Sequence, residues 1–221
     1  MKFNIITIFP NILNSYKNEG MIKKAIERKI ISINPINLRD FTTDKHKTVD
    51  DTPYGGGAGM LLKVEPIYKA IRSVQKKNNL KTKKIILLSA NGQKWNQQKA
   101  NEYSKLKEIT FVCGRYEGVD NRVKEFIDEE ISIGDYVLTG GELPAMIIID
   151  SISRLLPEML GNPNSSIDES HSEKGQGEYP QYTKPSLFSV GKNKYKVPKV
   201  LLSGNHKEIE KWKKENIKKM S

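Results

Sequence analysis

Strand-length apolar runs alternate with amphipathic segments along the first 160 residues. The clearest runs are KKIILLSA (83–90), EITFVCG (108–114) and EEISIGDYVL (129–138). Continuous apolar runs that follow charged residues are typical of parallel strands covered on both faces. The alternation of strands and helices therefore predicts an α/β fold, with a mostly parallel sheet and flanking helices.

The other elements follow from spacing and composition. Strands are expected over residues 2–8 and 30–38, and helices over 20–29, 65–77, 94–106, 118–127 and 141–160. Residues 161–185 are rich in Gly, Pro, Ser and Asn and contain few apolar side chains, which is typical of a linker. We therefore expect one domain over residues 1–160, a flexible linker over 161–185 and a small basic helical domain over 186–221.

The charge of the chain is concentrated at its C-terminal end. The formal net charge is +11, and residues 192–221 hold ten Lys and three Glu, so +7 of it lies there. This asymmetry favours a polyanionic partner such as nucleic acid. A lysine-rich solvated tail is the alternative.

Several classes of protein are disfavoured. A single Cys excludes internal disulfides and fits a reducing cytoplasm. Three scattered His and this one Cys make a zinc site implausible. No segment reaches the roughly 18 apolar residues of a membrane span, and the N-terminus lacks a signal-peptide pattern. We expect a cytoplasmic protein without a membrane partner, in which Cys113 ends a buried strand rather than acting as a nucleophile.

Three glycine-containing loops follow the three apolar runs: SANGQK, CGRYEGVD and IGDYVLTGGELP. Ligands of parallel α/β sheets bind at the carboxyl ends of the strands, where such loops meet. None of the loops matches the dinucleotide or P-loop phosphate motifs. The third loop is rich in apolar side chains, so it suits a flat ring such as adenine better than a phosphate. The alternative is that its glycines only begin the next helix.

Five segments, in order, strongly resemble the bacterial tRNA (guanine-N1)-methyltransferase (TrmD) family of the SPOUT class. They are VDDTPYGGGAGML, FVCGRYEGVDNRV, SIGDYVLTGGELPAM, IDSISRLLPEMLGNPNS and YPQYTKP. The resemblance implies S-adenosylmethionine as methyl donor, a deep trefoil knot around it, and a homodimer with composite active sites. Methyl transfer to N1 of the guanosine immediately 3′ of the tRNA anticodon is implied too, and a Mg²⁺ requirement is compatible with the family. Family members generally continue further, so the basic C-terminal domain is expected to be short.

The resemblance also places the functional residues. The cofactor contacts that it implies are Leu88, Ser89, Gly114, Tyr116, Glu117, Gly118, Ile133, Gly134, Asp135, Tyr136, Val137, Leu138, Gly140, Gly141 and Pro144.

Two roles remain for the chemistry. Guanine N1 carries a proton at neutral pH, so a base must remove it while a cation holds the charge that moves to O6. Arg154 is the candidate cation, and an i,i+4 pair with Asp150 is the alternative explanation for it. The family has an Asp-Ser pair in the linker, and this chain has IDESHSEKG. Alignment on the Ser makes Glu169 the candidate base and Asp168 the second choice.

Two other functions stay open. The chain could be a non-catalytic RNA-binding protein, or a methyltransferase of the same knotted class that acts on another RNA.

Overall fold

The computed structural model describes residues 1–75, 82–159 and 179–217. The chain divides into two compact units, Met1–Gly161 and Asn162–Ser221, which are described separately. No helix among the described residues is long and apolar enough to cross a bilayer.

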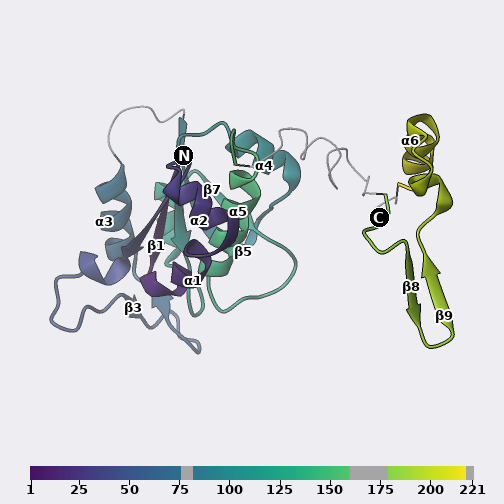
Figure 1. Ribbon diagram of the computed structural model, residues 1–221. Coiled ribbons are helices and arrows are strands. Elements are labelled where there is room, and N and C mark those ends of the chain that lie inside the picture. Colours follow the sequence, from purple (N-terminus) through teal and green to yellow (C-terminus); the bar gives the residue numbers. More distant parts are fainter. Residues whose placement is uncertain (76–81, 160–178, 218–221) are drawn as a thin grey trace. The chain divides into compact units, whose positions relative to one another are not determined.

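A five-stranded parallel sheet forms the centre of the first unit (Figure 1). Its strand order is β2-β1-β6-β5-β7. The strands span Lys2–Thr7 (β1), Ser32–Asn37 (β2), Lys83–Lys94 (β5), Glu108–Cys113 (β6) and Glu129–Ser132 (β7). The predicted α/β class with a parallel sheet is therefore confirmed.

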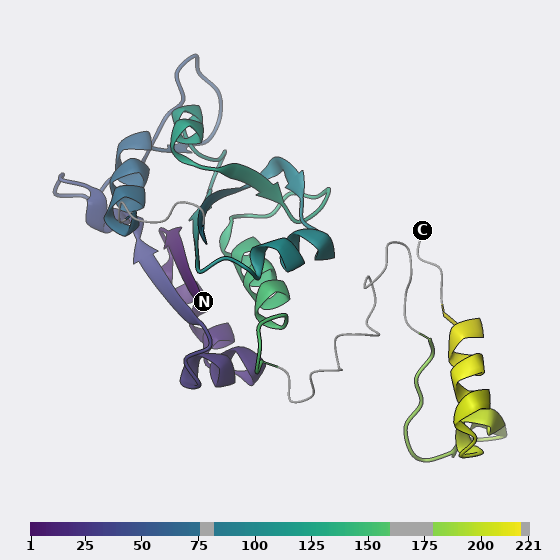
Figure 2. The same ribbon diagram turned by 90° about the horizontal axis from the view of Figure 1, so that it is seen from above.

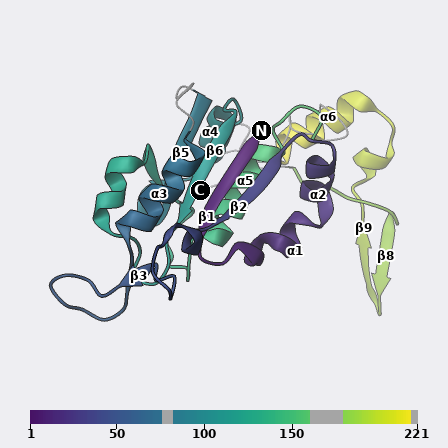
Figure 3. The same ribbon diagram turned by 90° about the vertical axis from the view of Figure 1, so that its left-hand side faces the viewer.

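Helices cover both faces of this sheet (Figures 2 and 3). One face packs against α2 (Gly20–Glu27), α4 (Gln97–Tyr103) and α5 (Glu142–Ser153), and the other against α3 (Val64–Val74). Along β5, Ile86 and Leu88 enter the first core and Ile85 and Leu87 the second. Because side chains alternate along a strand, burial of both faces explains the unbroken apolar run.

Short elements connect these layers. They are η1 (Pro10–Leu13), α1 (Asn14–Lys17), η2 (Leu38–Phe41), β3 (Asp50–Asp51), β4 (Leu61–Leu62) and η4 (Asn121–Phe126). The segment expected as an α-helix over 118–127 is the 3-10 helix η4, which begins where the Asp120 side chain accepts a hydrogen bond from the backbone N–H of Arg122.

The strand ends next to β7 differ from the sequence expectation. β7 stops at Ser132 instead of continuing to residue 138, while β5 continues to Lys94. The pairing of the two strands is interrupted, since Ile131 pairs with Leu88 and again with Gln93. The backbone therefore makes an excursion over residues 89–92 and returns to the same strand. Residues 89–94, which form the excursion and rejoin β7, have no hydrophobic pattern from which this path could be predicted.

Gly92 lies where the excursion returns, pressed against the backbone of β7. A Cβ atom built at Gly92 would lie 2.5 Å from the carbonyl carbon of Glu130 and 2.5 Å from the nitrogen of Ile131. These backbone atoms cannot rotate away, so one of the two segments must shift.

We expect Gly92→Ala to lower the free energy of unfolding by at least about 1–3 kcal/mol, the usual cost of overpacking. Urea denaturation measures this. Gly114→Ala is the matched control, because a Cβ there would meet nothing nearer than 3.7 Å. Equal stability of the two variants would contradict the close approach.

The second unit contains a β-hairpin as well as helices, which corrects the prediction of a small basic helical domain over residues 186–221. β8 (Leu187–Val190) and β9 (Asn193–Lys196) pair antiparallel, and η6 (Lys199–Leu202) and α6 (His206–Glu215) follow. Gly191 has φ +58°, and a glycine in this conformation is typical of a two-residue hairpin loop. The lysines of β9 hide the strand signal, because they replace the apolar residues that a half-buried strand would show.

Candidate active site

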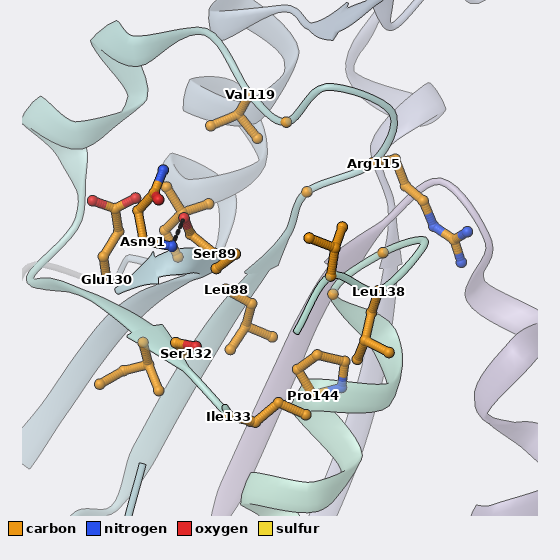
Figure 4. Close-up of a pocket in the computed structure, with 18 of the residues that line it drawn as sticks. Leu88, Ser89, Asn91, Arg115, Val119, Glu130, Ser132, Ile133, Leu138 and Pro144 are labelled. Atoms are coloured by element: carbon orange, nitrogen blue, oxygen red, sulfur yellow. Dashed lines mark hydrogen bonds between the residues drawn. The ribbon is translucent and has the colours of Figure 1, made fainter. Parts of the chain in front are cut away.

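A cavity of about 390 Å³ lies at the carboxyl ends of β5, β6 and β7 (Figure 4). Residues 87–91, 114–119, 130–134 and 136–141 contribute most of its lining. This is the strand edge at which open parallel sheets bind ligands, and the volume is in the range of small-molecule sites. The three glycine loops identified from the sequence therefore meet around one cavity.

The cavity has an apolar side and a polar side. Leu88, Ile133 and Pro144 point into one part of it, whereas Ser89, Asn91 and Glu130 lie together at another (Figure 4). The Ser89 hydroxyl accepts a hydrogen bond from the backbone N–H of Asn91 at 3.2 Å. An apolar slot beside a polar cluster suits a ligand that carries both a flat ring and hydroxyl or charged groups.

Glycines allow the loops to approach one another closely. A Cβ at Gly141 would lie 2.7 Å from Cα of Cys113, and one at Gly140 would lie 2.2 Å from Nε of Arg115. The backbone N–H of Gly141 donates to the carbonyl of Gly114 at 3.0 Å. The loop before α5 is thus joined directly to the loop after β6, which leaves no room for a larger residue at either glycine.

Nearly all of the expected cofactor contacts line this cavity. The structure brings together Leu88, Ser89, Gly114, Tyr116, Glu117, Gly118, Ile133, Gly134, Tyr136, Val137, Leu138, Gly140, Gly141 and Pro144. Asp135 is the exception, because it lies outside the lining and its exposed carboxylate pairs with Lys94.

Arg115, which lines the cavity, forms an ion pair with the buried Glu142 that the sequence did not predict. The Arg115 guanidinium donates from Nε to Oε2 of Glu142 at 3.0 Å, and from Nη1 to the carbonyl of Thr139 at 3.2 Å. The Thr7 hydroxyl donates to the other Glu142 oxygen at 2.5 Å. Glu142 is only 1% exposed. This network ties the loop after β6, the loop before α5 and the end of β1 together.

Cys113, at the same edge of the sheet, has limited chemistry. Cys113 is buried at the end of β6, and burial raises the pKa of its thiol well above the ordinary value. It is therefore the buried strand-end residue that the sequence predicted. Within the described ranges, no three His, Cys, Asp or Glu side chains gather as a metal site would require.

Comparison with known proteins settles the family. A profile of the family described as tRNA (Guanine-1)-methyltransferase TrmD matches residues 1–221. The chain is 51% identical over 220 residues to the tRNA (guanine-N(1)-)-methyltransferase of Dictyoglomus turgidum, covering 99% of this chain and 86% of that protein. The enzyme of the same name from Carboxydothermus hydrogenoformans is 52% identical over 97% of this chain and 81% of its own length. That from Enterococcus faecalis is 46% identical over 99% and 87%.

The chain belongs to the TrmD family. Its DDTPYGGGAGM segment, one of the motifs that suggested this family, lies next to the cavity. A Cβ at Gly59 would lie 2.5 Å from Cγ of Glu117, and the backbone N–H of Glu117 donates to the carbonyl of Met60 at 3.1 Å.

Tyr116 connects the cavity to the start of the DDTPYGGGAGM segment, where Asp50 lies. It has φ +58°, a conformation that is uncommon for a non-glycine residue and is found at functional sites. Partial desolvation, and then the neighbouring Asp50 carboxylate, raise the pKa of its phenol.

Arg154, the expected cation, does not line the cavity. It is an exposed residue at the C-cap of α5, and it lines a second hollow with Tyr16, Leu143 and Ile147. Asp150, its suggested partner, accepts a hydrogen bond from the Tyr16 hydroxyl at 2.8 Å. Glu169 and Asp168, the two candidate bases, lie outside the described residues.

Proposed function

We propose that this TrmD family member uses S-adenosylmethionine to methylate N1 of the guanosine immediately 3′ of the anticodon in tRNA. The observation that carries the proposal is the cavity formed by three glycine loops at the carboxyl edge of the sheet. Its apolar side, around Leu88, Ile133 and Pro144, suits an adenine ring. Its polar side suits ribose hydroxyls and the charged groups of an amino acid. The names of the relatives indicate that the methylated base is guanine and that the acceptor atom is N1.

S-adenosylmethionine supplies an electrophilic methyl group, so the protein has to prepare the acceptor nitrogen. A carboxylate, Glu169 or alternatively Asp168, takes the N1 proton, and the Arg154 guanidinium holds the charge that develops on O6. Arginine suits this role because it keeps its charge and presents several donors in a fixed geometry.

A homodimer accounts for the position of Arg154 outside the cavity of its own chain. The hollow that Arg154 lines adjoins exposed apolar side chains, with Ile12 47%, Leu143 61% and Ile147 47% exposed. A second copy that covers this face would bury them and bring each Arg154 towards the partner's cavity. A monomer in sedimentation experiments at micromolar concentration would contradict this part of the proposal.

We further propose that the loops around the cavity form the trefoil knot of the SPOUT class. Three close contacts support this proposal. The excursion of β5 leaves and rejoins β7, Gly92 lies against the backbone of β7, and Gly141 lies against Cys113 at the end of β6. In this arrangement, residues 161–185 form the linker that carries the base, and the basic residues 186–221 bind tRNA phosphates in the cytoplasm.

The decisive experiment compares two tRNA transcripts that differ only at the position 3′ of the anticodon. We expect methyl transfer from S-adenosylmethionine to the transcript with guanosine there, and none to the transcript with adenosine. Nuclease digestion and mass spectrometry of the product identify N1-methylguanosine, and parallel reactions with and without EDTA test for a Mg²⁺ requirement.

Each alternative function predicts a different result. A related methyltransferase with another RNA substrate would modify a different nucleotide. A non-catalytic RNA-binding protein would bind RNA in a salt-dependent manner, but would show no heat of binding for S-adenosylmethionine.

A further inference from the structure

The β8–β9 hairpin of the C-terminal unit has two chemically different faces, and all of its strand residues are exposed. Residues directly opposite in an antiparallel pair share a face. Phe188 lies opposite Tyr195, and we call this side the aromatic face. Lys194 and Lys196 lie opposite Ser189 and Leu187, and we call this side the lysine face.

The two rings of the aromatic face pack only partly on each other. Their centroids are 6.3 Å apart with an interplanar angle of 32°, and Phe188 and Tyr195 remain 57% and 58% exposed. A two-stranded hairpin is at best marginally stable alone in water. Two large rings that stay more than half exposed on so small an element therefore favour a binding surface over a structural role.

The other aromatic contacts described in this unit join separate segments. Tyr182 packs on Trp212 of α6 with centroids 6.4 Å apart, and Lys213 of α6 lies 5.1 Å from the centroid of the Tyr179 ring. These contacts hold the segment before the hairpin on α6. The hairpin itself extends away from α6 (Figures 1 and 3). The rings of the aromatic face thus have no comparable role in fixing this unit.

Charge identifies the class of molecule that fits this surface. Residues 179–207 contain six lysines, at positions 184, 192, 194, 196, 199 and 207, and no Asp or Glu. Lysines attract phosphates, while exposed aromatic rings stack on bases that are not already stacked in a duplex. A protein partner could also cover the two rings, but it would have to be strongly acidic to satisfy the lysines.

We propose that the hairpin is a binding site for unpaired nucleotides of the RNA substrate. A base stacks on Phe188 and Tyr195 of the aromatic face. The strand then passes over the edge of the hairpin, so that phosphates further along it contact Lys194 and Lys196 on the opposite, lysine face. This inference deepens the proposed function, on which it rests for the identity of the RNA. It assigns the hairpin a preference for single-stranded segments, which the net charge alone does not give.

The test uses the full chain and two fluorescent RNA probes, a single-stranded oligoribonucleotide and the same strand annealed to its complement. The double variant Phe188→Ala/Tyr195→Ala is expected to bind the single strand roughly 5- to 150-fold more weakly, the range for loss of one base–aromatic stack. Its affinity for the duplex should be nearly unchanged. Wild-type affinity of this variant for the single strand would overturn the proposal.

Two further variants separate stacking from folding. Phe188→Leu/Tyr195→Leu keeps apolar side chains but removes the rings, and it should lose affinity like the alanine variant. Phe188→Tyr/Tyr195→Phe exchanges the rings and should bind like the wild type. If the leucine variant binds normally, apolar contact alone is sufficient and stacking is wrong. A change in oligomeric state without a change in RNA affinity would assign the face to a protein contact and also overturn the proposal.

The lysine face has its own signature. Each of Lys194→Ala and Lys196→Ala should reduce the slope of log affinity against log salt by about one phosphate contact, on both probes. Unchanged slopes would remove the lysine face from the site.

The hairpin proposal and the proposed function fail in different ways. The residues that line the cavity all belong to the first unit, so calorimetry with S-adenosylmethionine should give the same affinity for the alanine variant and the wild type. With tRNA as substrate, the variant should raise KM more than it lowers kcat. Absence of cofactor binding in the wild type would defeat the proposed function, whereas ring-independent RNA binding by an active enzyme would defeat only the hairpin site.

Discussion

Replacing Glu142 by alanine is expected to cost about 3–5 kcal/mol in the free energy of unfolding, the usual result of removing one partner of a buried ion pair. Glu142 is 1% exposed and accepts hydrogen bonds from Arg115 and Thr7. Without it, the Arg115 guanidinium, whose side chain is only 15% exposed, keeps its charge but loses its counterion. Because domains of this size are stable by only about 5–15 kcal/mol, the loss is a large fraction of the total.

The same substitution should weaken binding of S-adenosylmethionine beyond the effect on folding. Arg115 belongs to the loop after β6, and it also donates to the Thr139 carbonyl in the loop before α5. Loss of Glu142 therefore loosens the cavity walls from two sides. Calorimetry at a temperature where the variant is still folded measures this effect.

Two variants control the experiment. Glu142→Gln keeps the shape of the side chain and an oxygen that accepts from Thr7, but removes the charge. Its free energy of unfolding should lie between those of the Glu142→Ala variant and the wild type. Glu65→Ala removes an exposed glutamate that pairs with Lys69 at 2.7 Å, and it should change stability little. If Glu142→Ala unfolds at the same urea concentration as Glu65→Ala, the network does not stabilise the site.

The sheet could be predicted because its strands have recognisable local patterns of hydrophobic residues. Buried strands such as β5 and β6 need apolar side chains on both faces, so each leaves a short continuous apolar run in the sequence. The loops at their ends could also be located, since ligands of parallel sheets bind at that edge. Their mutual contacts could not, because Gly92 and Gly141 are informative only once the opposing backbone is known.

The Arg115–Glu142 pair shows a second limit. The two residues are 27 positions apart in the sequence. Judged from the sequence alone, Arg115 is an ordinary polar residue of a loop and Glu142 an ordinary one of a first helical turn. Burial of an acidic residue depends on the tertiary arrangement, so a local sequence pattern cannot predict that burial. The hairpin escaped prediction for the opposite reason, since its strands are exposed on both faces and carry no burial pattern at all.

Glu169→Gln is expected to lower the single-turnover rate of methyl transfer by about 10²–10⁴-fold, the usual contribution of a general base. The amide is nearly the same size as the carboxylate but cannot accept the guanine N1 proton at neutral pH. The cofactor cavity is built from other segments of the chain, so the affinity for S-adenosylmethionine should stay close to that of the wild type. Rapid-quench assays with saturating tRNA, combined with calorimetry, separate the two quantities.

Asp168→Asn is the matched control, because it makes the same chemical change one residue earlier. If Glu169 is the base, this neighbouring substitution should leave most of the rate intact. The reverse result would assign the base to Asp168, whose side chain is one methylene shorter and would have to approach the guanine more closely. Full activity in both variants would show that neither carboxylate takes the proton, and the base would then have to be sought among the groups around the cavity. Glu117 would be the first of these to test, because it lines that cavity and also contacts Gly59 of the GGGAGM segment.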